Sequence, residues 1–351
     1  MAKKKSNVQL LILSFMVALF IKKYVYTFDR DAYVNVYNSN IVLWNSNYTS
    51  SNISYGPCDC VKYSFEDHPN YLGKCAFPKI IFFAFYVDGE ISEDTSRRFS
   101  SASNTTKSKK ITALNPRRLL ANFRESISIF HPSACLVVRT NNDELFRNIY
   151  GVWALNRTMA VYKSYTATKI AAQLQFYSRL LEVTSRQDKI MLYFVDPDML
   201  LVGKLDYLVS PDIYFDMAVT VRTYVKMPIN AGFLAVTRRS NSTLVKLTFE
   251  EMITISKNMT SVFADQIAMQ TVFKCVDTKK NKIMTALHDL KVFCLQASIY
   301  NASPNDVHTR ILKDTVLLHF KGDRKKFQVQ ILNKLKKGSA SSALRLAKSI
   351  N

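Results

Sequence analysis

The chain has 351 residues, of which 48% are hydrophobic and 12% aromatic, so it can form one large or two medium domains and is not wholly disordered. Glycine is scarce, with 8 residues, and the absence of G-x-G-x-x-G and G-x-x-x-x-G-K-[ST] excludes the common glycine-rich nucleotide loops. The formal net charge of +21 favours an anionic partner: nucleic acid, an acidic membrane surface or a phosphorylated small molecule.

Residues 1–28 are expected to hold a cytoplasmic tail, residues 1–7, and a transmembrane signal anchor, residues 8–28. Three lysines precede the apolar run Val8–Ile21 and two follow it. Such a run spans about 21 Å as a helix, short of the roughly 30 Å hydrocarbon core, so a signal-peptide core and a buried helix are alternatives. No small-x-small cleavage site follows. The lysine asymmetry favours a single-pass type II protein, with the rest of the chain in the lumen of the Golgi or endoplasmic reticulum.

Two further patterns agree with a secretory compartment. Seven Asn-x-Ser/Thr sequons occur where chance predicts roughly three or four: Asn47, Asn52, Asn104, Asn156, Asn241, Asn258 and Asn301, the last of them weakened by Pro304. All six cysteines follow the anchor: Cys58, Cys60, Cys75, Cys135, Cys275 and Cys294. Disulfides of undetermined pairing are expected, and a metal site at the Cys58-Asp-Cys60 pattern is the alternative. A lumenal protein meets little nucleic acid, which therefore is not the expected partner.

A stem over residues 29–77 is expected to lead into a folded domain, residues 78–327. Asn115 and Pro116 are typical of a helix N-cap and first helical position. The polar run 89–110 is expected to be a loop and could act as a lid over a site. The first predicted elements are a strand at 79–87, a helix at 115–130, a strand at 134–139, a helix at 166–183 and a strand at 190–195.

The same alternation continues toward the C-terminus. Strands are predicted at 215–221, 229–236, 292–295 and 315–320, helices at 242–256 and 263–273, and a basic helical tail at 328–351. Strands that alternate with helices predict an α/β fold with a mostly parallel, Rossmann-like sheet flanked by helices. No internal repeat is visible.

Two aspartates directly follow the apolar strand at 190–195. Asp196 and Asp198 flank Pro197, and in an open α/β sheet ligands bind outside the carboxyl ends of the strands. Two carboxylates held together favour a divalent cation, Mn²⁺ or Mg²⁺, which can in turn bind a diphosphate. The alternative is a solvated turn in which one aspartate caps the next segment.

Four motifs follow one another in an informative order. They are "LYFVDPDMLL", "NAGFLAV" from Asn230, "ADQIAMQTVF" from Ala264 and "LLHFKGDRK" from Leu317. This order resembles glycosyltransferases of the GT-A fold, most closely family 8 and related nucleotide-diphospho-sugar transferases, from about Lys79 to Lys326. The resemblance implies a GT-A fold, a Mn²⁺ or Mg²⁺ cofactor and a retaining sugar transfer.

The resemblance also implies roles for individual residues. Asp196, Asp198 and His319 would bind the metal, with Asp196 on the metal or the ribose. Asn230, Asp265 and Gln266 would contact the sugar at the catalytic centre. The remaining donor-binding positions would be Ala84, Tyr86, Lys169, Gly232, Lys321, Gly322, Arg324 and Lys325. The K-P-W ending of the family is missing here, which leaves open which lysine binds the diphosphate.

The sequence therefore predicts a hexosyl- or pentosyltransferase that uses a nucleotide-diphosphate sugar and a lumenal glycan, glycoprotein or glycolipid acceptor. His319 could instead be a core histidine, and Asp265 could be a helix N-cap. If the reaction inverts, Asp265 is the candidate base. A non-catalytic sugar-binding protein and a metal-dependent phosphohydrolase are the alternative functions.

Overall fold

The computed structural model describes residues 79–87, 115–146, 149, 152–156, 162, 164–184, 189–261, 263–275 and 281–350. They belong to one compact unit, Tyr55–Asn351. The predicted tail, signal anchor, stem and polar loop 89–110 lie outside these residues. Among the helices described, none is both long and apolar enough to cross a bilayer.

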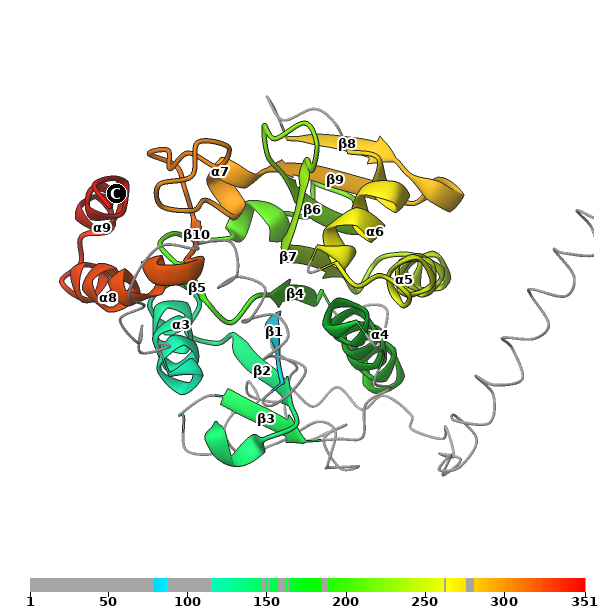
Figure 1. Cartoon of the computed structure of the whole chain (residues 1–351), viewed down its shortest axis with the longest axis horizontal. Coiled ribbons are helices and arrows are strands. Elements are labelled where there is room, and N and C mark those ends of the chain that lie inside the picture. The colour runs from blue at the N-terminus through cyan, green and yellow to red at the C-terminus, as the bar shows by residue number, and fades with distance from the viewer. Residues whose placement is uncertain are drawn as a thin grey trace, which may run out of the picture. The chain divides into compact units, whose positions relative to one another are not determined.

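An eight-stranded sheet forms the centre of the unit, in the order β3-β2-β1-β4-β7-β6-β9-β8 (Figure 1). β7 and β8 run antiparallel to the other six strands, which confirms the α/β class and the mainly parallel sheet. The strands are β1 Ile80–Tyr86, β2 Cys135–Thr140, β3 Val152–Asn156, β4 Met191–Val195, β6 Met217–Val221, β7 Ile229–Thr237, β8 Lys282–Thr285 and β9 Lys291–Gln296.

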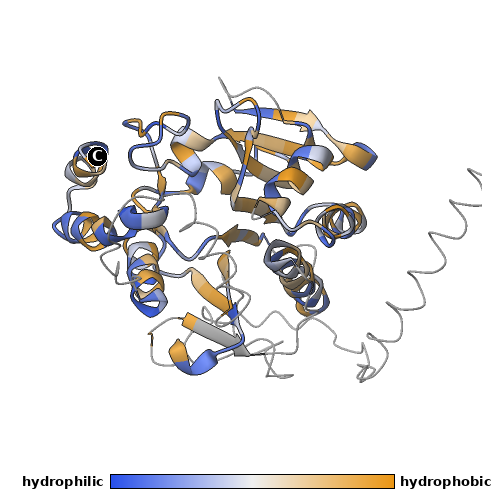
Figure 2. Ribbon diagram, in the orientation of Figure 1, coloured by the Kyte–Doolittle hydropathy of each residue, from blue (hydrophilic) through white to orange (hydrophobic). Residues whose placement is uncertain are grey.

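Helices cover both faces of this sheet, with α4, α5 and α6 on one face and α3 on the other, and α8 lies beside α3 (Figure 1). The central strands are apolar throughout because both of their faces are buried (Figure 2). Phe83 packs on Phe194 toward α4, and Phe82 packs on Tyr193 toward α3. The helices are α3 Pro116–Phe130, α4 Tyr165–Val183, α5 Ser242–Ser256, α6 Ala264–Phe273, α7 Ala297–Tyr300, α8 Gln328–Lys336 and α9 Ala340–Lys348.

Local signals in the sequence fix several of these boundaries. The Asn115 side chain accepts the N–H of Arg117 at 2.9 Å and Pro116 opens α3, which confirms both predictions. A disulfide joins Cys275, after α6, to Cys294 in β9, and confirms the expectation of disulfides for this pair.

A small second sheet lies beside the large one and was not predicted. It pairs β5, Met199–Leu201, with β10, Leu317–His319, in antiparallel orientation. β5 has only three residues, too few for its sequence to indicate a strand. β3 and the mostly exposed β8 of the large sheet were not predicted either. The helices predicted for the basic tail, α8 and α9, pack against this small sheet through Ile331, Leu335 and Leu344.

Candidate metal and donor site

Asp196 and Asp198 lie at the bend where the chain leaves the large sheet for the small one. β4 ends at Val195, and β5 begins at Met199. The backbone of this bend is fixed on both sides, because Asp196 N–H donates to Gly232 O at 3.1 Å and Phe320 N–H donates to Asp198 O at 2.9 Å. The two carboxylates are therefore held at the carboxyl end of β4, as predicted.

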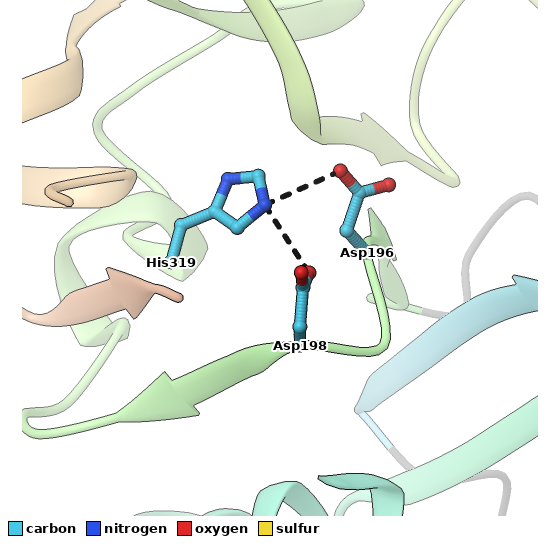
Figure 3. A group of neighbouring side chains, drawn as sticks. All are labelled: Asp196, Asp198 and His319. Carbon is cyan, nitrogen blue, oxygen red and sulfur yellow. Dashed lines mark ion pairs between the residues drawn. The ribbon is translucent and has the colours of Figure 1, made fainter. Parts of the chain in front are cut away.

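His319 reaches the same point through β10. Antiparallel pairing places His319 opposite Met199, the residue after Asp198. His319 Nε2 lies 3.2 Å from Asp198 Oδ1 and 3.6 Å from Asp196 Oδ2 (Figure 3). One ligand atom from each of the three side chains lies within 4.8 Å of the others. The structure thus brings together the three residues predicted to bind a metal.

The donor set of this cluster fits a divalent cation. His319 Nδ1 faces Asn301 Oδ1 at 3.0 Å, so Nδ1 carries the hydrogen, and Nε2 of a neutral imidazole turns its lone pair toward the carboxylates. Three lone-pair donors facing one another need a cation among them or a proton on Nε2. Two carboxylates and an imidazole suit Mn²⁺, and the carboxylates also suit Mg²⁺. Asp196 keeps 26% of its side chain exposed, so a ligand can reach the cluster from solvent.

Lys169, from α4, is a buried bridge rather than a free cation. Its Nζ donates to Asp196 Oδ1 at 2.7 Å, to Asp265 Oδ2 at 3.4 Å and to Ala231 O at 3.3 Å. Burial lowers the pKa of Lys169, but Asp196 and Asp265 outweigh burial and raise that pKa above its ordinary value. All three ammonium hydrogens are thus donated to oxygen atoms of the protein, between Asp196 and the start of α6.

Lys325 pairs with the other carboxylate of the cluster. Its Nζ lies 3.0 Å from Asp198 Oδ2, and 35% of its side chain is exposed. Burial raises the pKa of Asp198, but Lys325 and a His319 ring that carries the proton on Nε2 in the absence of a cation outweigh it and hold that pKa well below its usual range. The Asp198 carboxylate is therefore ionised, and Lys325 stands between it and solvent.

Three neighbours of Lys325 were also predicted to bind the donor, and their surroundings differ: Lys321, Gly322 and Arg324. Burial, and then Arg222, lower the pKa of Lys321. Arg324 donates to Ser303 Oγ at 3.0 Å and to the carbonyl oxygen of Pro304, so its guanidinium is tied to the neighbouring loop. Gly322 has φ +56°, a left-handed conformation that favours glycine.

Asn230 and Gly232 lie at this edge because β7 is antiparallel to β4 and begins where β4 ends. A Cβ on Gly232 would lie 2.8 Å from His319 Nδ1, so only glycine leaves room for the imidazole. Asn230 Oδ1 accepts the N–H of Gly232 at 3.2 Å, while its buried Nδ2 has no hydrogen-bond partner among the described residues.

Asp265 and Gln266 open α6 behind Lys169. The N-cap of α6 is Phe263, so the N-cap interpretation of Asp265 is wrong, although Asp265 Oδ1 accepts the N–H of Gln266 at 2.8 Å. Burial raises the pKa of Asp265, and Lys169 opposes that increase. Gln266 Oε1 accepts Arg222 Nη2–H at 2.8 Å, which links α6 to the end of β6, a connection that the sequence did not indicate.

Ala84 and Tyr86 end β1 at the same edge of the sheet. Ala84 is fully buried opposite Val195, so its side chain belongs to the core. Tyr86 is half-buried, and its ring stands edge-on to Phe146 with the ring centroids 5.5 Å apart. Tyr86 is therefore the better placed of the two for contact with a ligand.

Asn301 is the residue of this site that sequence reasoning missed. It was considered only as a glycosylation sequon, but it is fully buried and its amide nitrogen donates to Thr220 Oγ1 at 2.9 Å. The sequon is therefore closed to glycosylation in the folded chain. No signal in the sequence relates Asn301 to His319.

No family model matches the sequence, and no curated protein matches it. Among solved structures, similar chains include a glycosyltransferase involved in glycosylation of the major capsid of PBCV-1, at 10% identity and TM-score 0.42, with 73% of this chain and 99% of that chain covered. The glycosyltransferase GlyE of Streptococcus pneumoniae TIGR4 is 12% identical, at TM-score 0.44, with 76% and 62% covered. An active-site mutant of LgtC is 13% identical, at TM-score 0.40, with 74% and 95% covered. With every TM-score below 0.5, these likenesses carry no weight for the function of this chain.

Proposed function

We propose that this chain is a metal-dependent glycosyltransferase of the GT-A type. It moves a hexosyl or pentosyl group from a nucleoside-diphosphate sugar to a glycan, glycoprotein or glycolipid acceptor. The observation that carries the proposal is the convergence of Asp196, Asp198 and His319 at the carboxyl edge of the sheet, with Lys325 against Asp198. The order of the four sequence motifs supports the same reaction class.

The site holds charges suited to a diphosphate leaving group. A bound Mn²⁺ or Mg²⁺ would neutralise the negative charge that grows on the diphosphate as the glycosidic bond breaks. Lys325 can exchange its ion pair with Asp198 for one with the donor, because it is partly exposed. Lys321 adds a second ammonium on the same segment. These cations favour the transition state over the ground state because the leaving group becomes more anionic.

The sugar would lie toward Asn230, Asp265 and Gln266. In a retaining transfer no strong base is needed, and the buried Lys169–Asp265 pair then serves to hold α6 against Asp196. In an inverting transfer Asp265 is the candidate base, and its raised pKa, caused first by burial, favours proton acceptance.

We place the protein in the Golgi or endoplasmic reticulum membrane as a single-pass type II protein with a lumenal catalytic domain. The lysine-flanked apolar run Val8–Ile21, the sequons and the Cys275–Cys294 disulfide support this location. The acceptor would then be a lumenal glycan or glycoconjugate.

The test is hydrolysis of a panel of nucleoside-diphosphate sugars by the full-length chain in mild detergent, with and without Mn²⁺. We expect turnover of one donor that needs Mn²⁺ and falls at least about 100-fold in Asp198→Asn, because a lost metal ligand weakens transition-state stabilisation. Asp206→Asn is the matched control, since Asp206 is exposed and pairs only loosely with Lys204 at 3.9 Å.

The products separate the alternatives. Free sugar and nucleoside diphosphate indicate a transferase that uses water as acceptor, whereas nucleoside monophosphate and sugar 1-phosphate, from cleavage of the diphosphate, indicate a phosphohydrolase. If no donor is turned over and no nucleoside diphosphate binds in the presence of Mn²⁺, the chain is a non-catalytic protein of this fold.

A further inference from the structure

We infer that the tripeptide Asn301-Ala302-Ser303 is a clamp that positions His319, and that Asn301 selects the ring nitrogen that faces Asp196 and Asp198. The inference rests on the proposed metal site and assigns a role to residues that the sequence marked only as a sequon. Each residue of the tripeptide makes its own hydrogen bond to His319.

The backbone of His319 is held by two of the three residues. His319 N–H donates to Ala302 O at 2.7 Å, and Ser303 Oγ–H donates to His319 O at 2.9 Å. Because β10 also pairs with β5, the His319 backbone is fixed from both sides. The imidazole therefore has its rotation about the side-chain bonds as its main remaining freedom.

Asn301 removes that freedom through its side-chain carbonyl. The orientation of its amide follows from its neighbours: Thr220 Oγ–H donates to Asn230 O at 3.0 Å, so Thr220 Oγ1 is free to accept from Asn301 Nδ2 at 2.9 Å. A second acceptor, Asn230 O, lies 3.4 Å from the same nitrogen. Asn301 Oδ1 must then face His319 Nδ1, which must donate.

The choice of tautomer decides what the site can bind. With hydrogen on Nδ1, the Nε2 lone pair points toward Asp196 and Asp198 and can ligate a cation. With hydrogen on Nε2, the imidazole would donate directly to Asp198, 3.2 Å away, and close the cluster on itself. Asn301 and Thr220 are both fully buried, so water does not compete for these hydrogen bonds.

The same hydrogen bonds are incompatible with a glycan attached to Asn301. A glycosylated Asn301 would need its Nδ2 at the surface, but that nitrogen lies inside, between Thr220 and Asn230. Asn241 and Asn258, by contrast, are exposed and remain open to modification.

The experiment compares the full-length chain with Asn301→Leu, which keeps the side-chain size and removes the carbonyl, and with Asn301→Asp, which keeps an acceptor oxygen. Thr248→Val is the matched control, because it removes a buried hydroxyl whose hydrogen bond, to Leu244 O, lies within α5. NMR of ¹⁵N-labelled histidine in metal-free protein measures whether Nδ1 of His319 carries hydrogen, either in the neutral ring or in the ring protonated on both nitrogens. The signal is assigned among the five histidines with His319→Gln.

We expect hydrogen on His319 Nδ1 in the wild type, with or without a second hydrogen on Nε2, and its loss in Asn301→Leu. Mn²⁺ binding, measured by electron paramagnetic resonance, should weaken by about 10- to 100-fold in Asn301→Leu, as is typical when the partner of a metal-bound histidine is removed. Asn301→Asp should restore both the tautomer and most of the affinity. Thr248→Val should change neither, although it lowers stability.

Two results would overturn the inference alone: a wild-type His319 without hydrogen on Nδ1, or wild-type Mn²⁺ affinity in Asn301→Leu. If Asn301→Leu fails to fold, the wild-type tautomer and Asn301→Asp still decide the matter. Absence of Mn²⁺ binding by the wild type would instead overturn the proposed metal-dependent function, and the positioning role with it.

Discussion

Gly232 lies so close to His319 that a side chain on the glycine would overlap the imidazole. An added Cβ would be 2.7 Å from His319 Cε1 and 3.1 Å from Asp196 Oδ2. Gly232 therefore contributes to the metal site by leaving space for the imidazole, because the ring of His319 lies against the backbone of β7.

We expect Gly232→Ala to push the His319 ring away from Asp196 and to weaken Mn²⁺ binding by about 10-fold or more, since contacts this short force atoms to move. Gly338→Ala is the control, because Gly338 has φ +75° in the turn before α9 and a side chain there costs about 1 kcal/mol without touching the site. Calorimetric titration with Mn²⁺ measures the effect. Equal affinity in both variants would show that the imidazole relocates without leaving the cluster.

Lys325 and Lys326 are adjacent lysines with different surroundings. Substituting each of them in turn tests which ammonium binds the diphosphate. Lys325 faces Asp198, whereas Lys326 lies over the ring of Phe327. We expect Lys325→Ala to raise the KM for the donor by about 10-fold, the loss of one charge-assisted contact, and Lys326→Ala to leave it within about twofold. Steady-state hydrolysis of the donor gives both values. The reverse order would transfer the role to Lys326.

Lys169 is expected to stabilise the fold more than it binds the donor. Lys169→Met leaves Asp196 and Asp265 facing each other without a cation, which should lower the free energy of unfolding by about 3 kcal/mol. Adding Asp265→Asn should recover part of that loss by removing one of the two charges. Urea denaturation at neutral pH measures both steps. Unchanged stability combined with a raised KM for the donor would instead support the donor-binding role implied by the family resemblance.

His131 makes the fold sensitive to acid at the contact between the end of α3 and Leu205. Its buried Nε2 accepts the N–H of Leu205 at 3.0 Å, and burial lowers the pKa of His131 from its ordinary 6.5, against a smaller opposing effect of Asp206. The stability that neutral His131 contributes is present above pH 6.5 and is lost as the pH falls through the lower pKa of the folded state.

We therefore expect the free energy of unfolding of the wild type to fall more steeply between about pH 7 and pH 5 than that of His131→Gln, whose amide oxygen accepts the same bond without titrating. His288→Gln is the control, since His288 is exposed. Urea titrations at several pH values give the slopes. Parallel slopes for the wild type and His131→Gln would show that other groups set the acid sensitivity.

Much of the local structure follows from short stretches of sequence. The short apolar runs of β1 and β4 are typical of strands buried on both faces, and Asn115 with Pro116 marks the start of α3. The order of the four motifs also indicated which side chains would meet, and the structure brings Asp196, Asp198 and His319 together.

For several predicted site residues, the structure shows a role that differs from the expected one. Lys169 was expected to bind the donor, but its ammonium donates hydrogen bonds to the carboxylates of Asp196 and Asp265. Gly232 was predicted only as a donor-binding position, and the structure shows that its missing side chain gives His319 room. These roles depend on neighbours from other elements, which local sequence does not specify.

The sequence by itself determined the α/β class, the bounds of the long elements and the position of two carboxylates at a strand end, because hydrophobic periodicity and turn chemistry act over a few residues. Only the tertiary structure decided that β10 pairs with β5, that Asn301 is buried beneath His319 and that β7 begins at the carboxyl end of β4. These contacts join segments far apart in the chain, and the packing of the whole core selects them.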